Sequence, residues 1–236
     1  RFLEKLDITV LSHTVKIGGI YSDFRPNHAD DLESADQNPV RCMDENSSKL
    51  MIEKIKQAKD SGDTLGGQVQ IIVSGMSFGY GSHTQYDKKL DAKIMADLGS
   101  IQSVKSVSFG LGEKYGEVLG TKSHDPIGYK DGKFFRYSNN SGGIDGGITT
   151  GENIVVNISF KPIPTTMKGI KTVDMITHQE SISSKERSDV CAVPAAGVVC
   201  ENVLAITLMQ TILETLGGDY MQEIKQRFQK KKEIIL

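Results

Sequence analysis

The chain has 236 residues, of which 25% are charged, and its formal net charge is −2 at pH 7. A chain of this length can bury one large hydrophobic core or two small ones. The near-neutral charge argues against a dedicated nucleic-acid binder, and no basic stripe interleaved with aromatic residues is present in the sequence.

Membrane, secretory and metal-binding features are not expected either. No stretch approaches the ~20 apolar residues that span a bilayer, and the opening RFLEKLDITV lacks the apolar region of a signal peptide. The cysteines, Cys42, Cys191 and Cys200, form no CxxC pair and match no zinc-ligand spacing. We therefore expect a cytoplasmic protein with reduced thiols, without a metal and without a membrane.

The N-terminal part of the chain is predicted to contain a strand, a long loop and a helix. The strand covers residues 9–20, and the polar loop over residues 23–47 is bounded by two prolines. A helix follows within residues 48–63, with Asn46 or Ser47 as its cap. The apolar residues on or near one face of this helix are Leu50, Ile52 and Ile55.

The central part alternates predicted strands with one amphipathic helix. Residues 68–76 are rich in β-branched side chains, which is typical of a strand, and residues 104–110 predict another. A helix is expected over residues 86–98, and residues 128–137 indicate a hairpin with an Asp-Gly turn. The apolar stripe of the helix, at i, i+4 and i+8, consists of Leu90, Ile94 and Leu98.

The C-terminal part begins with a half-buried strand. Within residues 152–162, apolar residues alternate with Asn157 and Ser159. A short strand is predicted at residues 171–177, and a long apolar helix then breaks at Gly217-Gly218 before a second helix. We therefore predict one domain, residues 1–236, of the α+β class, with helices packed on mostly antiparallel sheets.

The densest cluster of glycines is SNNSGGIDGGITTG, residues 138–151. The lysine and helix of a phosphate-binding P-loop do not follow it, and the strand-then-helix context of a dinucleotide fingerprint is also missing. A plain wide turn and a loop that contacts a ligand both remain open, because glycine allows positive φ and close approach in either case. Asn139 and Asn140 are interpreted as structural turn residues.

Two histidine-containing segments are weaker candidates. His124 and Asp125 look like a catalytic pair, but a loop histidine beside a proline is more often merely polar. His28, with the acidic residues Asp30, Asp31 and Glu33 nearby, is a poor candidate for a metal site.

Four separated blocks of the sequence carry a family resemblance. In chain order they are GGQVQIIVSGM followed by FGYG, LDAKIMADLGSIQSVKSVSFG, NNSGGIDGGITTGENIVVNISFKP and RSDVCAVPAAGVVCENVLAITLMQTILE. Together these blocks resemble the C-terminal two-thirds of chorismate synthase. The resemblance covers nearly the whole chain.

The resemblance implies a fold, a reaction and a cofactor. Chorismate synthases are homotetramers in which helices are sandwiched between antiparallel sheets. They convert 5-enolpyruvylshikimate-3-phosphate to chorismate and phosphate by an anti-1,4-elimination within the shikimate pathway of aromatic amino acid biosynthesis. The reaction needs reduced FMN although it has no net redox change, and NADP is an associated nucleotide.

The resemblance also implies which residues contact the flavin. They are Gln102 and Ser103, Gly146, the segment Lys161, Pro162, Ile163, Pro164 and Thr165, and Arg187. Asp189 matches the family's catalytic aspartate, which is thought to help the flavin N5 act as the base. Lys161 and Arg187 would offer cations to anionic groups. We expect these segments to converge on one face of a planar, anionic cofactor.

Each of these assignments has a structural alternative. Lys161 can be a solvated strand end, and Arg187 with Asp189 can be a surface ion pair. The sequence also departs from the family pattern: Ser188 replaces a histidine, Pro164 replaces a serine, and Gln102-Ser103 replaces Asn-Ala. These departures leave the flavin contacts of Pro164 and Gln102 open.

A larger departure is that the family's first segment has no counterpart here. We therefore expect a domain truncated at its N-terminus that turns over little substrate alone, because expelling phosphate needs cations and a proton donor that the missing segment carries. The alternative from another class is a non-catalytic assembly or scaffold module that kept the fold.

Overall fold

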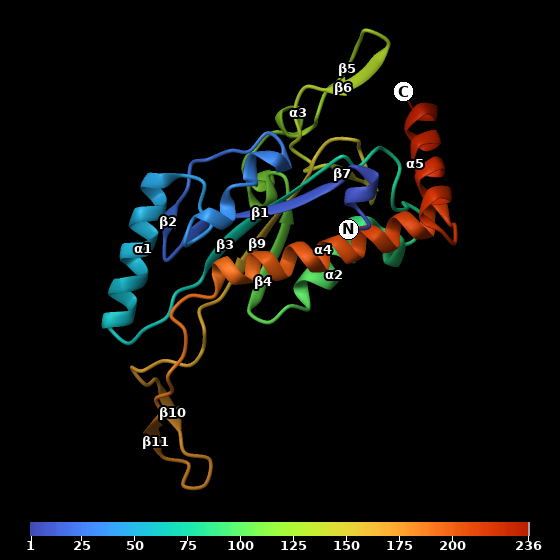
Figure 1. Ribbon diagram of the computed structural model, residues 1–236. Helices are drawn as coiled ribbons and strands as arrows, with labels where there is room; N and C mark the ends of the chain where they lie inside the picture. Colours follow the sequence, from blue (N-terminus) through green and yellow to red (C-terminus); the bar gives the residue numbers. More distant parts are fainter. Residues whose placement is uncertain (236) are drawn as a thin grey trace.

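An antiparallel sheet of five strands forms the centre of the structure, a computed structural model that describes residues 1–235 (Figure 1). The strand order is β2-β1-β3-β9-β4, and every neighbouring pair runs antiparallel. The strands are β1 (Thr9–Ile17), β2 (Ile20–Tyr21), β3 (Gly67–Ser74), β4 (Val104–Phe109) and β9 (Ile154–Phe160).

The two faces of this sheet differ in what covers them. On one face the apolar residues of β9 are buried, together with Ile71 of β3, which lies opposite Val156. Val155 and Leu11 lie on the other face, where the short helix η2 (Ala29–Leu32) packs on Ile72. The apolar alternation predicted for residues 152–162 is therefore confirmed.

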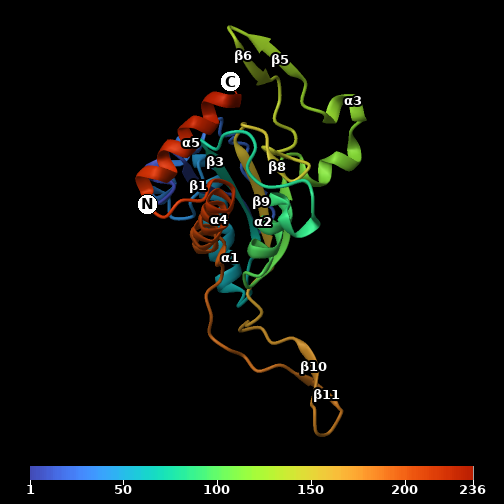
Figure 2. The ribbon, with the colours of Figure 1, turned by 90° about the vertical axis from the view of Figure 1, so that its right-hand side faces the viewer.

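Helices α2 (Leu90–Gly99) and α4 (Val193–Leu216) cover the first face and contact each other (Figure 2). The predicted stripe of α2 is confirmed, because Leu90, Ile94 and Leu98 are fully buried. On the outer side of α4, Val198, Val199 and Ile206 are exposed. Within residues 1–235 these helices thus have a large sheet on one side only, and the α+β class is confirmed.

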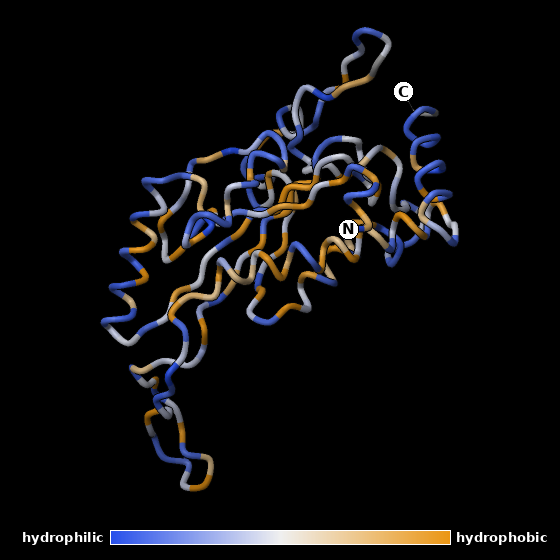
Figure 3. Tube along the Cα trace, in the orientation of Figure 1, coloured by the Kyte–Doolittle hydropathy of each residue, from blue (hydrophilic) through white to orange (hydrophobic). Residues whose placement is uncertain are grey.

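Helix α4 corrects the expectation that no stretch of the chain approaches the length of an apolar membrane span. Over its 24 residues it is long and apolar enough, by length and composition, to cross a membrane. The core helix of a soluble protein passes the same test, and 39% of its most apolar window is buried inside the fold. Its buried residues recur along the face that contacts β1 and β3, and Figure 3 shows the apolar residues gathered along these strands and α4.

The remaining helices lie at the edges of the sheet. They are α1 (Glu45–Asp60), the single turn α3 (Gly120–Ser123) and α5 (Met221–Ile235). The break at Gly217 and Gly218 between α4 and α5 is confirmed, and both glycines have positive φ. The 3-10 helices besides η2 are η1 (Glu4–Leu6), η3 (Ala35–Gln37), η4 (Tyr86–Lys88) and η5 (Gly112–Glu117).

Three small sheets of two strands each complete the described fold. Two of them are hairpins that extend from opposite ends of the body (Figure 1). The predicted turn of the first is confirmed, with φ of 53° at Asp131 and 82° at Gly132. The pairs are β5 (Ile127–Lys130) with β6 (Lys133–Arg136), β7 (Ile144–Asp145) with β8 (Ile148–Thr149), and β10 (Lys171–Val173) with β11 (Glu180–Ile182).

Several element boundaries differ from the prediction. The first strand ends at Ile17, because Gly18 and Gly19 turn the chain back into β2. The cap of α1 is Asp44, whose side chain accepts a hydrogen bond from the backbone N of Ser47 at 2.7 Å. Leu50 is exposed and its neighbour Met51 is buried, so the buried face of α1 lies one position further along.

A buried arginine joins three separate segments of the fold. The guanidinium of Arg41 donates to Asp36 at 2.7 Å, to the Ser12 hydroxyl at 2.9 Å and to Glu201 of α4 at 2.9 Å. Gly197 faces this cluster, and a Cβ at that position would lie 3.1 Å from the Arg41 guanidinium. The network explains how the loop over residues 35–42 is held against β1 and α4.

Candidate functional site

The glycine-rich run is organised by a buried carboxylate. Asp125 accepts hydrogen bonds from the Ser138 hydroxyl and the backbone N of Asn140, both at 2.6 Å, and from the backbone N of Ser141 at 2.9 Å. Burial alone would raise the pKa of Asp125, but these hydrogen bonds outweigh it and lower the pKa. Asp125 is therefore an anchor for the run.

Asn139 has a comparable structural role. Its side-chain nitrogen donates to the carbonyl of Asn153 at 2.8 Å, and its side-chain oxygen accepts from the backbone N of Gly143 at 2.8 Å. The first bond holds the run against the residue before β9, and the second fixes a turn within the run. The interpretation of Asn139 as a turn residue is confirmed.

Four of the five glycines of the run divide into two groups. At Gly142, Gly143 and Gly147 an added Cβ would lie within 3 Å of neighbouring backbone or of Lys89, so these positions need glycine for packing. At Gly146 an added Cβ would meet nothing within 4 Å, and φ is +59°. Gly146 is thus the member of this set whose backbone is open to a ligand.

The segment over residues 161–165 follows directly from β9 and is fixed by its backbone. The backbone N of Lys161 donates to the carbonyl of Ser103 at 2.9 Å. The hydroxyl of Thr64 donates to the carbonyl of Ile163 at 2.6 Å. The hydroxyl of Ser188 donates to the backbone carbonyl of Thr165 at 2.8 Å. Three loops therefore meet at this segment.

Gly66 completes this arrangement. A Cβ on Gly66 would lie 2.4 Å from the carbonyl oxygen of Phe160 and 2.9 Å from the nitrogen of Pro162. Only glycine allows the chain before β3 to pass so close to the end of β9. The backbone N of Leu65 also donates to the carbonyl of Val190 at 2.7 Å, which ties the segment before α4 to the same place.

The charged side chains at this end of the sheet are exposed. Lys161, Arg187 and Asp189 are exposed, and so are Gln102 and Pro164. Within residues 1–235 none of the three charged side chains forms an ion pair or a hydrogen bond. The surface ion pair between Arg187 and Asp189, weighed above as an alternative, is not formed.

The structure brings most of the sequence-predicted residues together but not all of them. Ser103, the segment over residues 161–165 and Ser188 meet at one end of β9. Gly146 lies beyond the other end, because Gly143 packs against Asn153 and Ile154. The seven residues of β9 rise about 3.3 Å each, so roughly 20 Å separate the two ends. Convergence of all segments within one chain is not observed.

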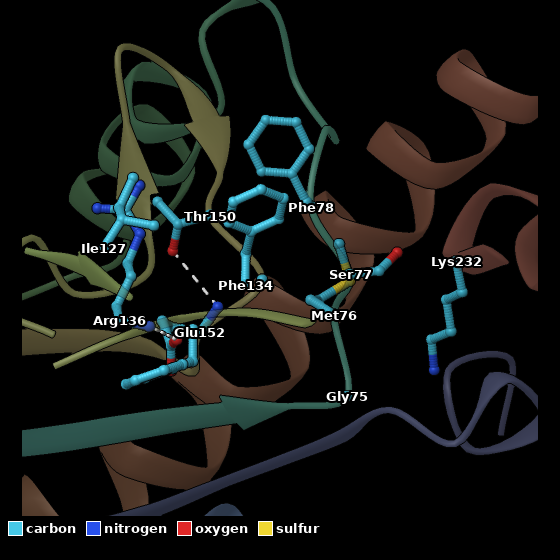
Figure 4. A pocket seen from close by; sticks show the side chains of 12 residues that line it. Gly75, Met76, Ser77, Phe78, Ile127, Phe134, Arg136, Thr150, Glu152 and Lys232 are labelled. Carbon is cyan, nitrogen blue, oxygen red and sulfur yellow. Dashed lines mark hydrogen bonds between the residues drawn. The ribbon is translucent and has the colours of Figure 1, made fainter. Parts of the chain in front are cut away.

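The end of the sheet that carries the glycine run also holds a cavity of about 670 Å³ (Figure 4). Its walls come from the loop after β3, the β5–β6 hairpin, the segment before β9 and helix α5. Phe78, Phe134 and Phe135 make it largely apolar, while Arg136 and Lys232 supply cations. The cavity was not predicted from the sequence, although the two adjacent phenylalanines, Phe134 and Phe135, lie in the predicted hairpin.

Of the two weaker candidates, the His28 segment has a structural role. The side chain of His28 caps η2, and Asp31 accepts from the backbone N of both Asn27 and His28. His124 lies at the C-terminal end of α3 and is exposed. In the described part of the chain, no three His, Cys, Asp or Glu side chains are grouped as metal ligands.

Sequence reasoning missed the residues that position the segment over residues 161–165. Thr64 acts through its hydroxyl and Gly66 through its lack of a side chain, 95 or more residues before the segment they hold. The Gly66-Gly67 pair is visible in the sequence, but by itself such a pair indicates only a turn after the predicted helix. Ser188, noted as a departure from the family pattern, turns out to fasten the loop that carries Arg187 and Asp189.

Comparison with known proteins gives consistent matches. A family profile described as chorismate synthase matches residues 1–213. A chorismate synthase of Tropheryma whipplei is 43% identical over 231 residues, which cover 96% of this chain and 58% of that protein. One of Geobacillus sp. (strain WCH70) is 43% identical over 235 residues, covering 98% of this chain and 60% of that protein.

A solved structure shows the same similarity in three dimensions. A crystal structure of chorismate synthase superimposes with a TM-score of 0.83 at 33% identity, covering 99% of this chain and 65% of that one. The chain thus spans a little under two-thirds of the length of the relatives it matches.

Proposed function

This chain belongs to the chorismate synthase family, and from that premise we propose that it takes part in the anti-1,4-elimination of phosphate from 5-enolpyruvylshikimate-3-phosphate. In that reaction a C–H bond and a C–O bond break, a new C=C bond forms, and a proton and phosphate leave to give chorismate. The enzyme class is therefore a carbon–oxygen lyase acting on a phosphate ester. The observation that supports this most is the family match over residues 1–213.

The donor set at the end of β9 fits reduced FMN, the cofactor that the family implies. Lys161 and Arg187 are exposed cations without ion pairs in the described residues, as binding of an anionic phosphate or flavin oxygen requires. Thr165 adds a hydroxyl, and the backbone of its segment is already held in place by Thr64 and Ser188. When bound there, reduced FMN supplies the electron-rich ring on which the elimination depends.

The residues around this position have separate proposed tasks. Lys161, Pro162, Ile163, Pro164 and Thr165 form the wall against the cofactor, and Gln102 and Ser103 border it from the start of β4. Arg187 orients an anionic group through its planar fork. Asp189, two residues along the same exposed loop, offers a carboxylate that can accept a proton. We propose Asp189 as the catalytic residue of this set.

Gly146 remains a proposed contact, because its backbone is open on the surface. It lies about one strand length from the cations. We also propose the homotetramer of the family, in which two copies can contribute to one site. Cytoplasmic location is proposed on the same basis, and the three thiols, all free in the structure, support a reducing compartment.

Flavin binding tests this function without depending on turnover. We expect titration of oxidised FMN, the strongly fluorescent form of the cofactor, with the purified chain to quench flavin fluorescence. Arg187→Ala and Lys161→Ala should each weaken binding about tenfold, because each removes one charge-assisted contact. Lys185→Ala is the matched control, since Lys185 is an exposed cation two residues from Arg187, and its binding should be unchanged.

Two results would contradict the proposal. The first is absence of quenching, which would favour the scaffold alternative for this chain. The second is an equal loss in all three variants, which would show that the effect is general charge and not a site. Chorismate formation, followed in the same preparations by its absorbance, tests the activity separately.

A further inference from the structure

The β10–β11 hairpin extends away from the body (Figures 1 and 2), and the side chains at its tip are apolar and exposed. Met175 is 86% exposed and Ile176 is 90% exposed. A hairpin of two strands is marginally stable by itself in water, and grouped exposed apolar residues mark interaction sites. The hairpin therefore needs a surface to pack against.

The turn at the tip is already fixed in shape. One carboxylate oxygen of Asp174 accepts hydrogen bonds from the backbone N of Ile176 at 2.9 Å and of Thr177 at 2.7 Å, and from the Thr177 hydroxyl at 3.0 Å. These bonds lower the pKa of Asp174, so the tip carries a negative charge at neutral pH. A rigid turn loses little conformational entropy when it binds.

The cavity of Figure 4 is the surface that matches this tip. Its volume of about 670 Å³ is in the range that takes a drug-sized ligand, and so has room for two aliphatic side chains. Phenylalanine rings attract a methionine sulfur as well as aliphatic groups. Figure 4 shows Phe78 and Phe134 on one side and Lys232 set apart from them, where its ammonium can meet the Asp174 carboxylate.

The positions of the tip and the cavity decide whether the contact forms within one chain or between two copies. The β10–β11 hairpin lies at one end of the molecule, and the β5–β6 hairpin and α5, which line the cavity, lie at the other (Figures 1 and 2). A chain therefore cannot place its own tip in its own cavity. Two copies related by a two-fold axis and lying antiparallel bring each tip to the cavity end of the other. The resulting dimer is closed, because both tip-to-cavity contacts form at once and neither copy keeps an unoccupied tip or cavity that could bind a third copy.

We propose that the Met175–Ile176 tip of one copy docks into the Phe78/Phe134 cavity of a second copy, and that the exchange is reciprocal. The apolar match provides burial, and Asp174 with Lys232 provides complementary charge. The proposal stands apart from cofactor binding, since none of these residues belongs to the proposed flavin site.

Association of the purified chain tests both halves of the contact. Sedimentation equilibrium should show self-association, and Ile176→Asp and Phe134→Asp should each weaken it at least tenfold, because each places a carboxylate in an apolar contact. Ser184→Asp and Leu119→Asp are the matched controls, since both positions are exposed and lie outside tip and cavity. A parent chain that stays monomeric, or an Ile176→Asp chain that associates as well as the parent, overturns the proposal.

Cross-linking tests which surfaces meet. Ile176→Cys mixed with Phe78→Cys should give a cross-linked dimer with a short bifunctional maleimide. Ile176→Cys alone should give only the background of the parent chain, because antiparallel copies hold their tips apart. Cross-linking of Ile176→Cys with itself, or with Leu119→Cys as readily as with Phe78→Cys, would show a different contact and refute the exchange. Circular dichroism melts confirm that each variant is folded.

Discussion

His13 is a residue whose charge the fold suppresses. It lies fully buried in β1 with Nε2 3.3 Å from the Gln70 side-chain oxygen, and its ring stands edge-on to Phe24. Burial lowers the pKa of His13 to about 4, with the charges of Arg25 and Arg41 acting in the same direction and the Gln70 hydrogen bond acting against it. The native sheet therefore favours the neutral form of His13.

This burial predicts a pH dependence of stability. Between pH 6.5 and about 4 the unfolded chain holds a proton on His13 that the native chain does not, so the stability present above pH 6.5 is lost as the pH falls. The loss reaches about 3 kcal/mol near pH 4, where the native chain begins to be protonated as well. Urea unfolding at a series of pH values should show this slope in the parent chain.

His13→Gln removes the titrating group and should flatten the slope over the same interval. The amide can still meet Gln70, whose own side chain donates to Asn157 of β9 at 2.9 Å. An unchanged slope in the variant would assign the pH dependence to other groups. An NMR titration midpoint of the His13 ring near 6.5 would also rule out the explanation.

At the scale of an element, α2 shows how one helix face carries the packing energy. Ile94 is fully buried between α4 and β4, whereas its neighbour Met95 is 44% exposed. Ile94→Ala should cost 2–5 kcal/mol, roughly, because it removes buried apolar area and leaves a cavity. Met95→Ala should cost under about 0.5 kcal/mol, as surface substitutions usually do.

Chemical denaturation of the two variants measures this difference directly. Both replace a flexible or branched apolar side chain with alanine in the same helix, so helix propensity changes little in comparison with burial. Similar losses in the two variants would mean that the α2 stripe does not face the core.

The elements that sequence reasoning found are those whose pattern is set by their own burial. β9 alternates because one of its faces lies under the helices, and Leu90, Ile94 and Leu98 recur because one face of α2 does. The reasoning failed where distant contacts decide the outcome. β11 was missed because its three residues are exposed and only Ile182 among them is apolar, and its pairing with β10 depends on the turn that Asp174 holds.

At the scale of the whole molecule, the candidate site also combines features that the sequence predicts with features that only distant contacts determine. The family resemblance selected the loop segments, but only the fold shows that Ser103, Thr64 and Ser188 clamp residues 161–165 from three sides. The separation of Gly146 from Lys161 was open to prediction, because a seven-residue extended strand between them forces them apart. The Arg41 network could not be predicted from the sequence, since its partners are up to 160 residues away.

Arg41 links the loop over residues 35–42 to the sheet and to α4, so its loss acts on the whole fold. The side chains of Arg41 and Glu201 are only 10% and 14% exposed. Arg41→Ala leaves the Glu201 carboxylate buried with only the backbone N of Ser12 as a partner, and should cost about 3–5 kcal/mol. Arg41→Lys should recover part of this, because one ammonium cannot reach all three partners.

A double-mutant cycle with Glu201→Ala separates the pair from its surroundings. If the cost of Arg41→Ala comes mainly from the stranded carboxylate, removing Glu201 as well should add far less than the sum of the single losses, with a coupling above about 1 kcal/mol. Urea midpoints with equal m-values give the four free energies of unfolding. Additivity within about 0.5 kcal/mol would show that Arg41 stabilises the fold through Ser12 and Asp36 alone, and that α4 is held to the sheet by apolar packing without the charge.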